Sequence, residues 1–232
     1  MKTYLLLNIG TVIFPLLLSF DKKVHYVGKW KNLSLAILLT LIVFVVWDVF
    51  FTYYGIWSFN EEHLIGVNII NLPLEEWLFF ITVPFASVFI YECLKAYFPK
   101  LEFAKPALTI SRFLIPFFLM LGVLNWGQWY TSINFLVAAV TLYLHVQYFN
   151  SEYLSKFYLA YLIHLIPFGL VNGVLTALPV VIYNDAENYG IRLGTIPLED
   201  TVYSFTLLLM NISFFEYFTS KQKASATQTT PS

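Results

Sequence analysis

The stretch LPLEEWLFFITVPFASVFI, residues 72–90, places two adjacent carboxylates, Glu75 and Glu76, at the start of a long apolar segment. A near copy of its opening, IPLEDTVYS, recurs at residues 196–204. A helix needs roughly 20 apolar residues to span a bilayer. The first segment therefore predicts a membrane helix whose first turn is acidic, and the copy predicts a second helix of the same kind.

The composition of the whole chain indicates a polytopic membrane protein. Of its 232 residues 59% are hydrophobic and 12% are charged, with a mean hydropathy of +0.70, whereas a soluble domain carries roughly 25% charged residues. The net charge of −1 gives no basis for nucleic-acid binding. The single cysteine, Cys93, excludes an internal disulfide and a multi-cysteine metal site.

Apolar runs predict an all-α fold with seven transmembrane helices. We expect them at about residues 4–20, 33–54, 74–97, 107–124, 129–149, 157–179 and 198–218. Several of these runs contain Pro or Gly, which membrane helices tolerate where neighbours satisfy the freed backbone groups. The polar, low-complexity end of the chain, 219–232, is expected to be a disordered cytoplasmic tail.

The distribution of Lys and Arg predicts the orientation in the membrane. In a seven-helix arrangement, eleven of the 13 basic residues fall on one side, in the 1–2, 3–4 and 5–6 connections and the tail. Lys2 and Arg192 fall on the other side. We therefore expect an integral cell-membrane protein with its N-terminus outside and its C-terminus in the cytoplasm.

The two acidic motifs belong to a longer internal repeat. With an offset of 124 residues and no gap, the region from Asp48 to Glu92 lies in register with the region from Asn172 to Glu216. This predicts two parallel three-helix repeats, residues 1–100 and 126–218, joined by a connector helix at 101–125. Parallel repeats are related by an axis along the membrane normal, and such duplications build a site where the halves meet.

One depth of the membrane is expected to gather the polar groups of both repeats. These are the motif carboxylates with the residues four apart on two other helices: Glu75, Glu76, Glu199, Asp200, Asp48, Thr52, Asn172 and Thr176. Ionisable groups inside a membrane are functional candidates by default. A carboxyl group that stays protonated in such a layer is a general acid. The alternative to a catalytic role is a structural one, because Pro followed by acidic residues is also an ordinary start of a helix.

Aromatic residues flank this layer, and their π faces could stabilise a cation. The candidates are Trp47, Tyr53, Phe79 and Tyr203. An interfacial aromatic belt is the better interpretation of Trp57, Trp126 and Trp129. Glu92 and Glu216 lie ~25 Å further along their helices, where a structural or solvated role is at least as reasonable as catalysis. His145 and His164 are expected to pack or to form hydrogen bonds.

These motifs resemble the membrane-integral lycopene β-cyclases, which occur as two short subunits, as their fusion, or as the cyclase half of fungal bifunctional enzymes. The resemblance covers about residues 1–220. It rests on WDVFFTYYGIWSF (47–59), LPLEEWLFF (72–80) and YE (91–92), and on VNGVLT (171–176), VIYN (181–184), IPLED (196–200) and FEYF (215–218).

The resemblance implies an isomerase that cyclises lycopene without redox chemistry. An acid protonates the terminal double bond of the acyclic ψ end, the cation closes a six-membered ring, and a base removes a ring proton to leave a β end. Glu75 and Glu199 are the leading acid/base candidates, followed by Glu76 and Asp200; the repeat that supplies the acid is left open. Asp48, Thr52, Asn172 and Thr176 would orient the carboxyl groups. The chain has no dinucleotide fingerprint, so we expect no flavin and no metal.

Two other functions remain open. A carotenoid hydratase would use the same protonation, with water capturing the cation. A small transporter would share the 3+1+3 repeat plan, although a sugar path does not need paired acids. The expected partners are a carotenoid substrate, the lipid bilayer and, beyond these, other enzymes of the carotenoid pathway or a second copy of the chain.

Overall fold

The computed structural model describes residues 2–228, and this part of the chain is predominantly helical. Its seven α-helices are α1 (Thr3–Leu18), α2 (Trp30–Tyr53), α3 (Leu74–Tyr97), α4 (Ala104–Leu124), α5 (Trp129–Phe149), α6 (Leu154–Ala177) and α7 (Leu198–Gln228). The all-α prediction is confirmed. The expected segments agree with the helices to within about three residues, except at the end of α7.

The end of α7 differs from the sequence prediction. The tail was expected to be disordered from residue 219, but the helix continues through Gln228. Two contacts explain part of this extension: the Asn32 side chain of α2 donates to Gln222 Oε1 at 2.7 Å and to Thr219 Oγ1 at 3.4 Å. The last part of the predicted tail, 229–232, lies outside the described residues.

Short strands, which the sequence prediction did not contain, organise the connections. They are β1 (Trp57–Phe59), β2 (Asn68–Ile69), β3 (Leu72–Pro73), β4 (Val181–Tyr183), β5 (Arg192–Leu193) and β6 (Ile196–Pro197). Each has two or three residues, too few to give a recognisable alternation of polar and apolar positions. The hairpins β2–β3 and β5–β6 end where α3 and α7 begin, so they fix the position of the two acidic first turns.

The turns of these hairpins share an unusual backbone conformation. Ile70 has φ +61° and Gly194, 124 residues later, has φ +66°. Glycine adopts this left-handed conformation freely, whereas a β-branched residue does so at a cost. The first hairpin is therefore the more strained of the two.

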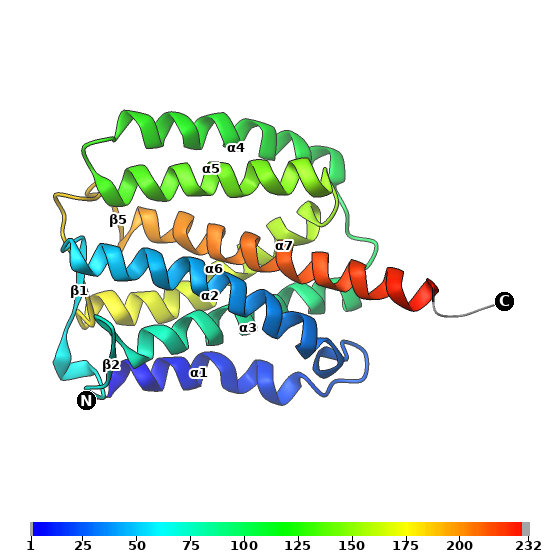
Figure 1. Cartoon of the computed structure of the whole chain (residues 1–232), viewed down its shortest axis with the longest axis horizontal. Helices are drawn as coiled ribbons and strands as arrows, with labels where there is room; N and C mark the ends of the chain where they lie inside the picture. Colours follow the sequence, from blue (N-terminus) through cyan, green and yellow to red (C-terminus); the bar gives the residue numbers. More distant parts are fainter. Residues whose placement is uncertain (1, 229–232) are drawn as a thin grey trace.

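The helices lie side by side along the long axis of the molecule (Figure 1). α4 packs against α5 at one edge, α1 packs against α3 at the other, and the centre is formed by contacts between α2 and α7 and between α3 and α6. The short strands and the N-terminus lie at one end of the helices, and α7 extends at the opposite end.

The strands β1 and β4 join the two halves of the chain across the strand-bearing end. They pair antiparallel with Ser58 opposite Ile182, a separation of 124 residues, so that Trp57 faces Tyr183 and Phe59 faces Val181. The two residues at the centre of this pairing, Ser58 and Ile182, occupy equivalent positions in the two repeats. A two-fold axis between the halves of the chain would produce this register.

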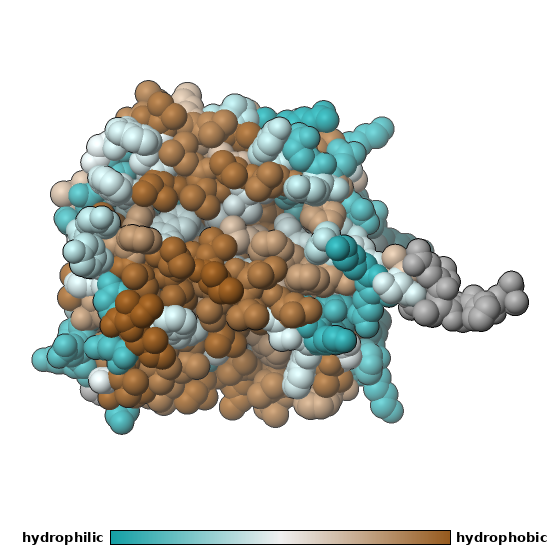
Figure 2. Space-filling model, in the orientation of Figure 1, coloured by the Kyte–Doolittle hydropathy of each residue, from teal (hydrophilic) through white to brown (hydrophobic). Residues whose placement is uncertain are grey.

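The surface has the character of a membrane protein. A broad apolar zone covers the middle of the visible face, and hydrophilic residues gather toward both ends (Figure 2). Within the described residues, five helical segments are long and apolar enough to cross a membrane: Tyr26–Tyr53, Leu74–Tyr97, Ala104–Leu124, Trp129–Phe149 and Leu154–Ala177. Their exposed large side chains would contact lipid rather than water.

α1 and α7 are less typical of membrane spans, for different reasons. α1 has 16 residues, or about 24 Å of helix, against a hydrocarbon core of about 30 Å. α7 is long enough, but Asn211 and Glu216 lower its hydropathy; both side chains are buried within the helix bundle. The polar residues of α7 thus face protein rather than lipid.

Candidate active site

A cavity of about 60 Å³ lies among the helix ends beside β1 and β4. Three carboxyl side chains line it: Asp48 of α2, Glu76 of α3 and Asp200 of α7. Four tyrosines, a tryptophan, three phenylalanines and an amide complete most of the wall: Tyr4, Tyr130, Tyr183, Tyr203, Trp57, Phe59, Phe79, Phe168 and Asn172. Among the described residues, no Lys or Arg lines the cavity.

Asp48 and Glu76 form one pair of carboxyl groups. Both are buried, and their side chains are within hydrogen-bonding contact of each other. Tyr203 donates to Asp48 Oδ1 at 2.7 Å, and Tyr4 donates to Glu76 Oε2 at 2.5 Å. Carboxylates accept hydrogen bonds only, so a hydrogen bond between two carboxyl groups requires one proton. This pair is therefore a candidate site for one shared proton inside the cavity.

Asp200 has a different environment, because three donors surround it. Tyr130 donates to its Oδ1, and Tyr183 and Asn172 donate to its Oδ2 at 2.8 and 2.7 Å. Hydrogen bonds donated to a carboxylate stabilise its charged form, whereas burial of the group opposes that charge. The hydroxyl of Tyr183, which belongs to β4 outside the helices, has its pKa raised well above the usual value by burial and by the neighbouring Asp200 charge, so it remains a donor.

The difference between the two halves arises at one position. Asp48 and Asn172 are separated by 124 residues, and each contacts the second carboxylate of its motif, Glu76 or Asp200. In the first half the contact is acid to acid; in the second it is amide to acid. The first half thus offers two carboxyl groups in mutual contact, and the second half offers one carboxyl group that accepts three hydrogen bonds.

Glu75 and Glu199, the leading candidates from the sequence, lie next to the cavity residues but do not line it. Both are buried and hold loop backbone: Glu75 Oε1 accepts from the Ile65 amide at 2.7 Å, and Glu199 Oε1 accepts from the Tyr189 amide at 2.7 Å. Consecutive helix residues point about 100° apart, so only one member of each pair can face the cavity. The structure places the second member there, which reverses the expected order.

Of the four residues expected to orient the carboxyl groups, two do so. Asp48 and Asn172 make the contacts described above. The Thr176 hydroxyl instead contacts Asn172 O at 2.8 Å and Thr195 Oγ1 at 2.6 Å. The Thr52 hydroxyl is buried and has no partner among the described residues. Neither threonine lines the cavity; each lies about 6 Å further along its helix than Asp48 or Asn172, on the same face.

Of the four aromatic candidates, two line the cavity and two do not. Phe79 and Tyr203 line the cavity, whereas Trp47 lies behind Tyr203, with ring centroids 5.1 Å apart. Tyr53 is 77% exposed and lies outside the cavity. Trp57 was expected in an interfacial belt, but it is buried against Tyr130 and lines the cavity because β1 folds inward to pair with β4.

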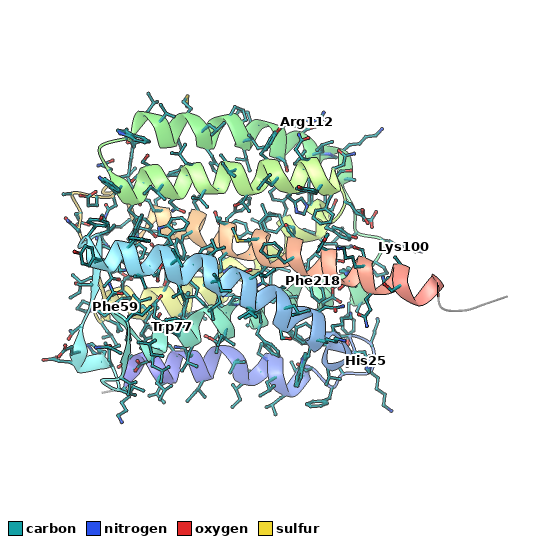
Figure 3. The ribbon with its side chains drawn as sticks, in the orientation of Figure 1. His25, Phe59, Trp77, Lys100, Arg112 and Phe218 are labelled. Carbon is teal, nitrogen blue, oxygen red and sulfur yellow. The ribbon has the colours of Figure 1, made fainter. Side chains whose placement is uncertain are left out.

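The remaining candidates lie far from the cavity. Glu92 contacts Lys29 and Lys95, and Glu216 contacts Lys95 at 2.5 Å and accepts from Tyr91 at 2.7 Å. These groups lie about 24 Å along α3 from Glu76, toward the end of the molecule where Lys100 and His25 are also seen (Figure 3). The geometry favours the structural interpretation of this cluster.

The sequence prediction named Tyr203 but missed the other tyrosines that donate to the carboxyl groups, Tyr4, Tyr130 and Tyr183. Tyr4 and Asn8 of α1 correspond to Tyr130 and Asn134 of α5: each tyrosine contacts the second carboxylate of a motif, and each asparagine donates to a backbone carbonyl, that of Glu75 or Glu199. Their spacing is 126 rather than 124 residues, so an ungapped comparison passes over them. The shared pattern Tyr-x-x-x-Asn, YLLLN at 4–8 and YTSIN at 130–134, was the available signal.

These features define a class of protein: a helical membrane protein with an acid–base site enclosed by aromatic side chains. Such a site can transfer a proton and stabilise a positive charge without the help of a basic residue.

Comparison with protein families identifies the family to which the chain belongs. The family model described as lycopene cyclase matches residues 1–94 and 127–218. The chain belongs to the lycopene cyclase family, which places it in carotenoid biosynthesis as a membrane-bound cyclase. The matched segments contain both acidic motifs and leave out α4. No curated protein and no solved structure matched the chain.

Proposed function

We propose that the chain is a lycopene β-cyclase, an isomerase that forms β rings from the ψ ends of lycopene by acid–base catalysis. The observation that carries this proposal is the cavity in which a proton-sharing carboxyl pair, Asp48 and Glu76, faces a donor-stabilised carboxylate, Asp200, within aromatic walls. Family membership supports the choice of substrate, and the geometry of the cavity supports the assignment of roles.

The first step assigns the acid to the first half of the chain. The proton held between Asp48 and Glu76 passes to the terminal double bond of the ψ end, which leaves a tertiary carbocation and an anionic carboxyl pair. Tyr4 and Tyr203, which donate to these two carboxyl groups, stabilise the charge that remains.

The second step forms the ring. The neighbouring double bond gives its π electrons to the cation, a carbon–carbon bond closes the six-membered ring, and the positive charge moves to a ring carbon. The faces of Trp57, Phe79 and the surrounding tyrosines line the cavity and would attract such a cation. Their packing also excludes water, which would otherwise capture the cation.

The last step assigns the base to the second half. Asp200 takes a proton from the ring carbon next to the cation, and the C–H electrons form the ring double bond. One proton is consumed and one is released, so the isomerisation is balanced without an oxidant or reductant. Return of that proton across the cavity to Asp48 and Glu76 restores the starting state.

The same proposal includes the architecture and the orientation. We infer that α1 and α7 also span the bilayer, that α1–α3 and α5–α7 form two parallel repeats connected by α4, and that residues 1–100, 101–125 and 126–218 delimit these parts. The end that carries β1 and β4 faces outside, because lysines gather at the opposite end. Lys100, labelled in Figure 3, lies at that opposite end, and Phe59 lies at the strand-bearing end.

Pigment analysis in a host that accumulates lycopene tests this function. The chain alone should convert lycopene to cyclic isomers of unchanged mass, and a Glu76→Gln/Asp200→Asn double variant of equal abundance should leave lycopene unchanged. Products heavier by one water would assign a hydratase instead. Unchanged lycopene with well-inserted wild-type protein would reject catalysis on this substrate.

A further inference from the structure

An apolar groove of about 500 Å³ runs between α1, α3 and α6. Its α1 wall extends from Leu6 to Leu18, a length of about 18 Å at 1.5 Å per residue. Leu6, Phe14 and Leu18 of this wall are exposed on the outside of the bundle. In a membrane, this groove would open to the acyl chains of the lipid.

The groove leads to the acid cavity. The groove and the cavity share four lining residues, Phe79, Val83, Phe168 and Asn172, whose side chains form the boundary between the two spaces. Asn172 is the residue that donates to Asp200. A molecule lying in the groove would therefore have its inner end beside the carboxyl groups.

The corresponding seam on the other half of the molecule does not reach the cavity. A hollow of about 590 Å³ lies between α2, α5 and α7, but none of its lining residues lines the cavity. Trp47, at the position corresponding to Val171, packs there against Phe44 and Tyr203, with ring centroids 5.7 and 5.1 Å apart. Trp47 in one seam is much larger than Val171 at the equivalent position of the other. This difference in size explains why the α1–α3–α6 seam is the open one.

One polar side chain, that of His164, is buried in the wall of the groove. Ser87 donates to Val83 O at 2.8 Å, so the 3.0 Å contact between Ser87 Oγ and His164 Nδ1 requires the ring to donate from Nδ1. The other ring nitrogen, Nε2, is buried and has no partner among the described residues. A hydrocarbon has no hydrogen-bond donor for this nitrogen, so His164 would form part of the groove wall without selecting the ligand.

We propose that the α1–α3–α6 groove is the binding site for the polyene chain of the carotenoid and the route by which an end group enters the acid cavity from the bilayer. This rests on the proposed function and deepens it. A conjugated chain is a stiff apolar rod, which matches a straight groove along a helix. Among the described residues, one of the two corresponding seams reaches the cavity. The two ends of a symmetrical substrate would therefore enter in turn, and a singly cyclised intermediate would leave or reverse between two ring closures.

Two groove variants and two matched controls test the proposal. Gly10 lines the groove, Gly169 of α6 does not, and a Cβ added at either meets no atom within 4 Å. Gly10→Trp and Gly169→Trp thus add the same bulk inside and outside the groove. Val171→Trp reproduces the side chain that fills the other seam, and Leu144→Trp fills the hollow between α2, α5 and α7 as its control.

Two quantities are measured: the kcat/KM of lycopene cyclisation in lipid vesicles, and the amount of lycopene that remains bound to the purified protein. Retention is measured in a Glu76→Gln background, so that binding is read without turnover. We expect Gly10→Trp and Val171→Trp to lower kcat/KM and lycopene retention at least tenfold, while Gly169→Trp and Leu144→Trp change either by less than about twofold.

Full activity and full retention in both groove variants would overturn the proposal, as would an equal loss in groove and control variants. The proposed function fails separately: groove-dependent retention of lycopene with no cyclic product from the wild type would keep the binding site and reject the cyclase. Absence of lycopene retention in the Glu76→Gln protein itself would reject the binding site.

Discussion

Glu76→Gln is the substitution that most sharply tests the assignment of the acid. The change keeps the size of the side chain and an oxygen for the Tyr4 hydroxyl, which lies 2.5 Å from Glu76 Oε2. The new amide can donate to Asp48, so the contact between α2 and α3 survives. What is lost is the proton shared between the two carboxyl groups.

The expected loss follows from the size of general acid catalysis. Such a group accelerates a reaction about 10²–10⁴-fold, which lowers the barrier by about 2.7–5.4 kcal/mol at 1.36 kcal/mol per tenfold. We expect kcat to fall by that range with little change in KM, because the polyene binding surface is untouched. The fold should stay intact, because no buried group loses its partner.

The neighbouring residue supplies the control. Glu75→Gln changes the same chemistry one position away, where the side chain holds the Ile65 amide at 2.7 Å instead of lining the cavity. Replacing the carboxyl acceptor by an amide oxygen should cost about 1 kcal/mol of stability and leave kcat within about threefold, since most molecules stay folded.

The assay is initial-rate cyclisation of lycopene in vesicles, with thermal unfolding of the purified variants measured in parallel. A Glu76→Gln enzyme with more than a tenth of wild-type kcat would refute the assignment. So would a Glu75→Gln enzyme that is fully folded and inactive, because that result would return the acid to the residue that the sequence alone favoured.

Three further predictions follow from other contacts. Asn172→Asp should lower kcat at least about tenfold, since it replaces the donor to Asp200 by a second carboxyl group; unchanged rates would contradict the assigned base. Ile70→Gly should raise the unfolding free energy by about 1 kcal/mol by relieving the positive φ, and a lower Tm would count against strain in that turn. The pKa of Asp185, in the loop after β4, is lowered by its hydrogen bonds from Asn188 and Arg192, so its contribution to stability is present above the ordinary aspartate pKa and lost as pH falls through the lower folded value. The destabilisation by Asp185→Asn should therefore be seen at pH 7 and shrink in that acidic range, and a penalty that persists at the lowest pH would contradict it.

The sequence predicted the helices well because a long apolar segment in a membrane must satisfy its backbone hydrogen bonds internally, which a helix does. It failed at the end of α7, where Lys, Gln, Ala and Ser gave no apolar signal and the helix is extended with the support of Asn32. It also gave no sign of the hairpins before α3 and α7. Those short strands depend on backbone pairing rather than on side-chain pattern, yet they set the position of the acidic turns.

For the site, residue type and repetition identified the acidic motifs but not which carboxylate faces the cavity. Glu75 and Glu76 are chemically alike, and the choice is made by loop amides: Ile65 holds the first, which leaves the second inside. Tyr183 and Trp57 reach the cavity only because β1 pairs with β4. Tyr4 and Tyr130 were hidden by a two-residue difference in spacing, which a gapped comparison of the two halves would have absorbed.

The central claim is that a proton held by the protein starts ring closure. It is tested most directly by running the reaction in D₂O and measuring the deuterium content of the products by mass spectrometry. The acid equilibrates with solvent, so each ring should carry one deuterium at the carbon that was protonated, and the ring carbon that loses a proton should release protium. Recovered lycopene should contain none if protonation commits the substrate to closure. Cyclic product without deuterium would contradict the account, because the hydrogen would then not have come from an exchangeable carboxyl group.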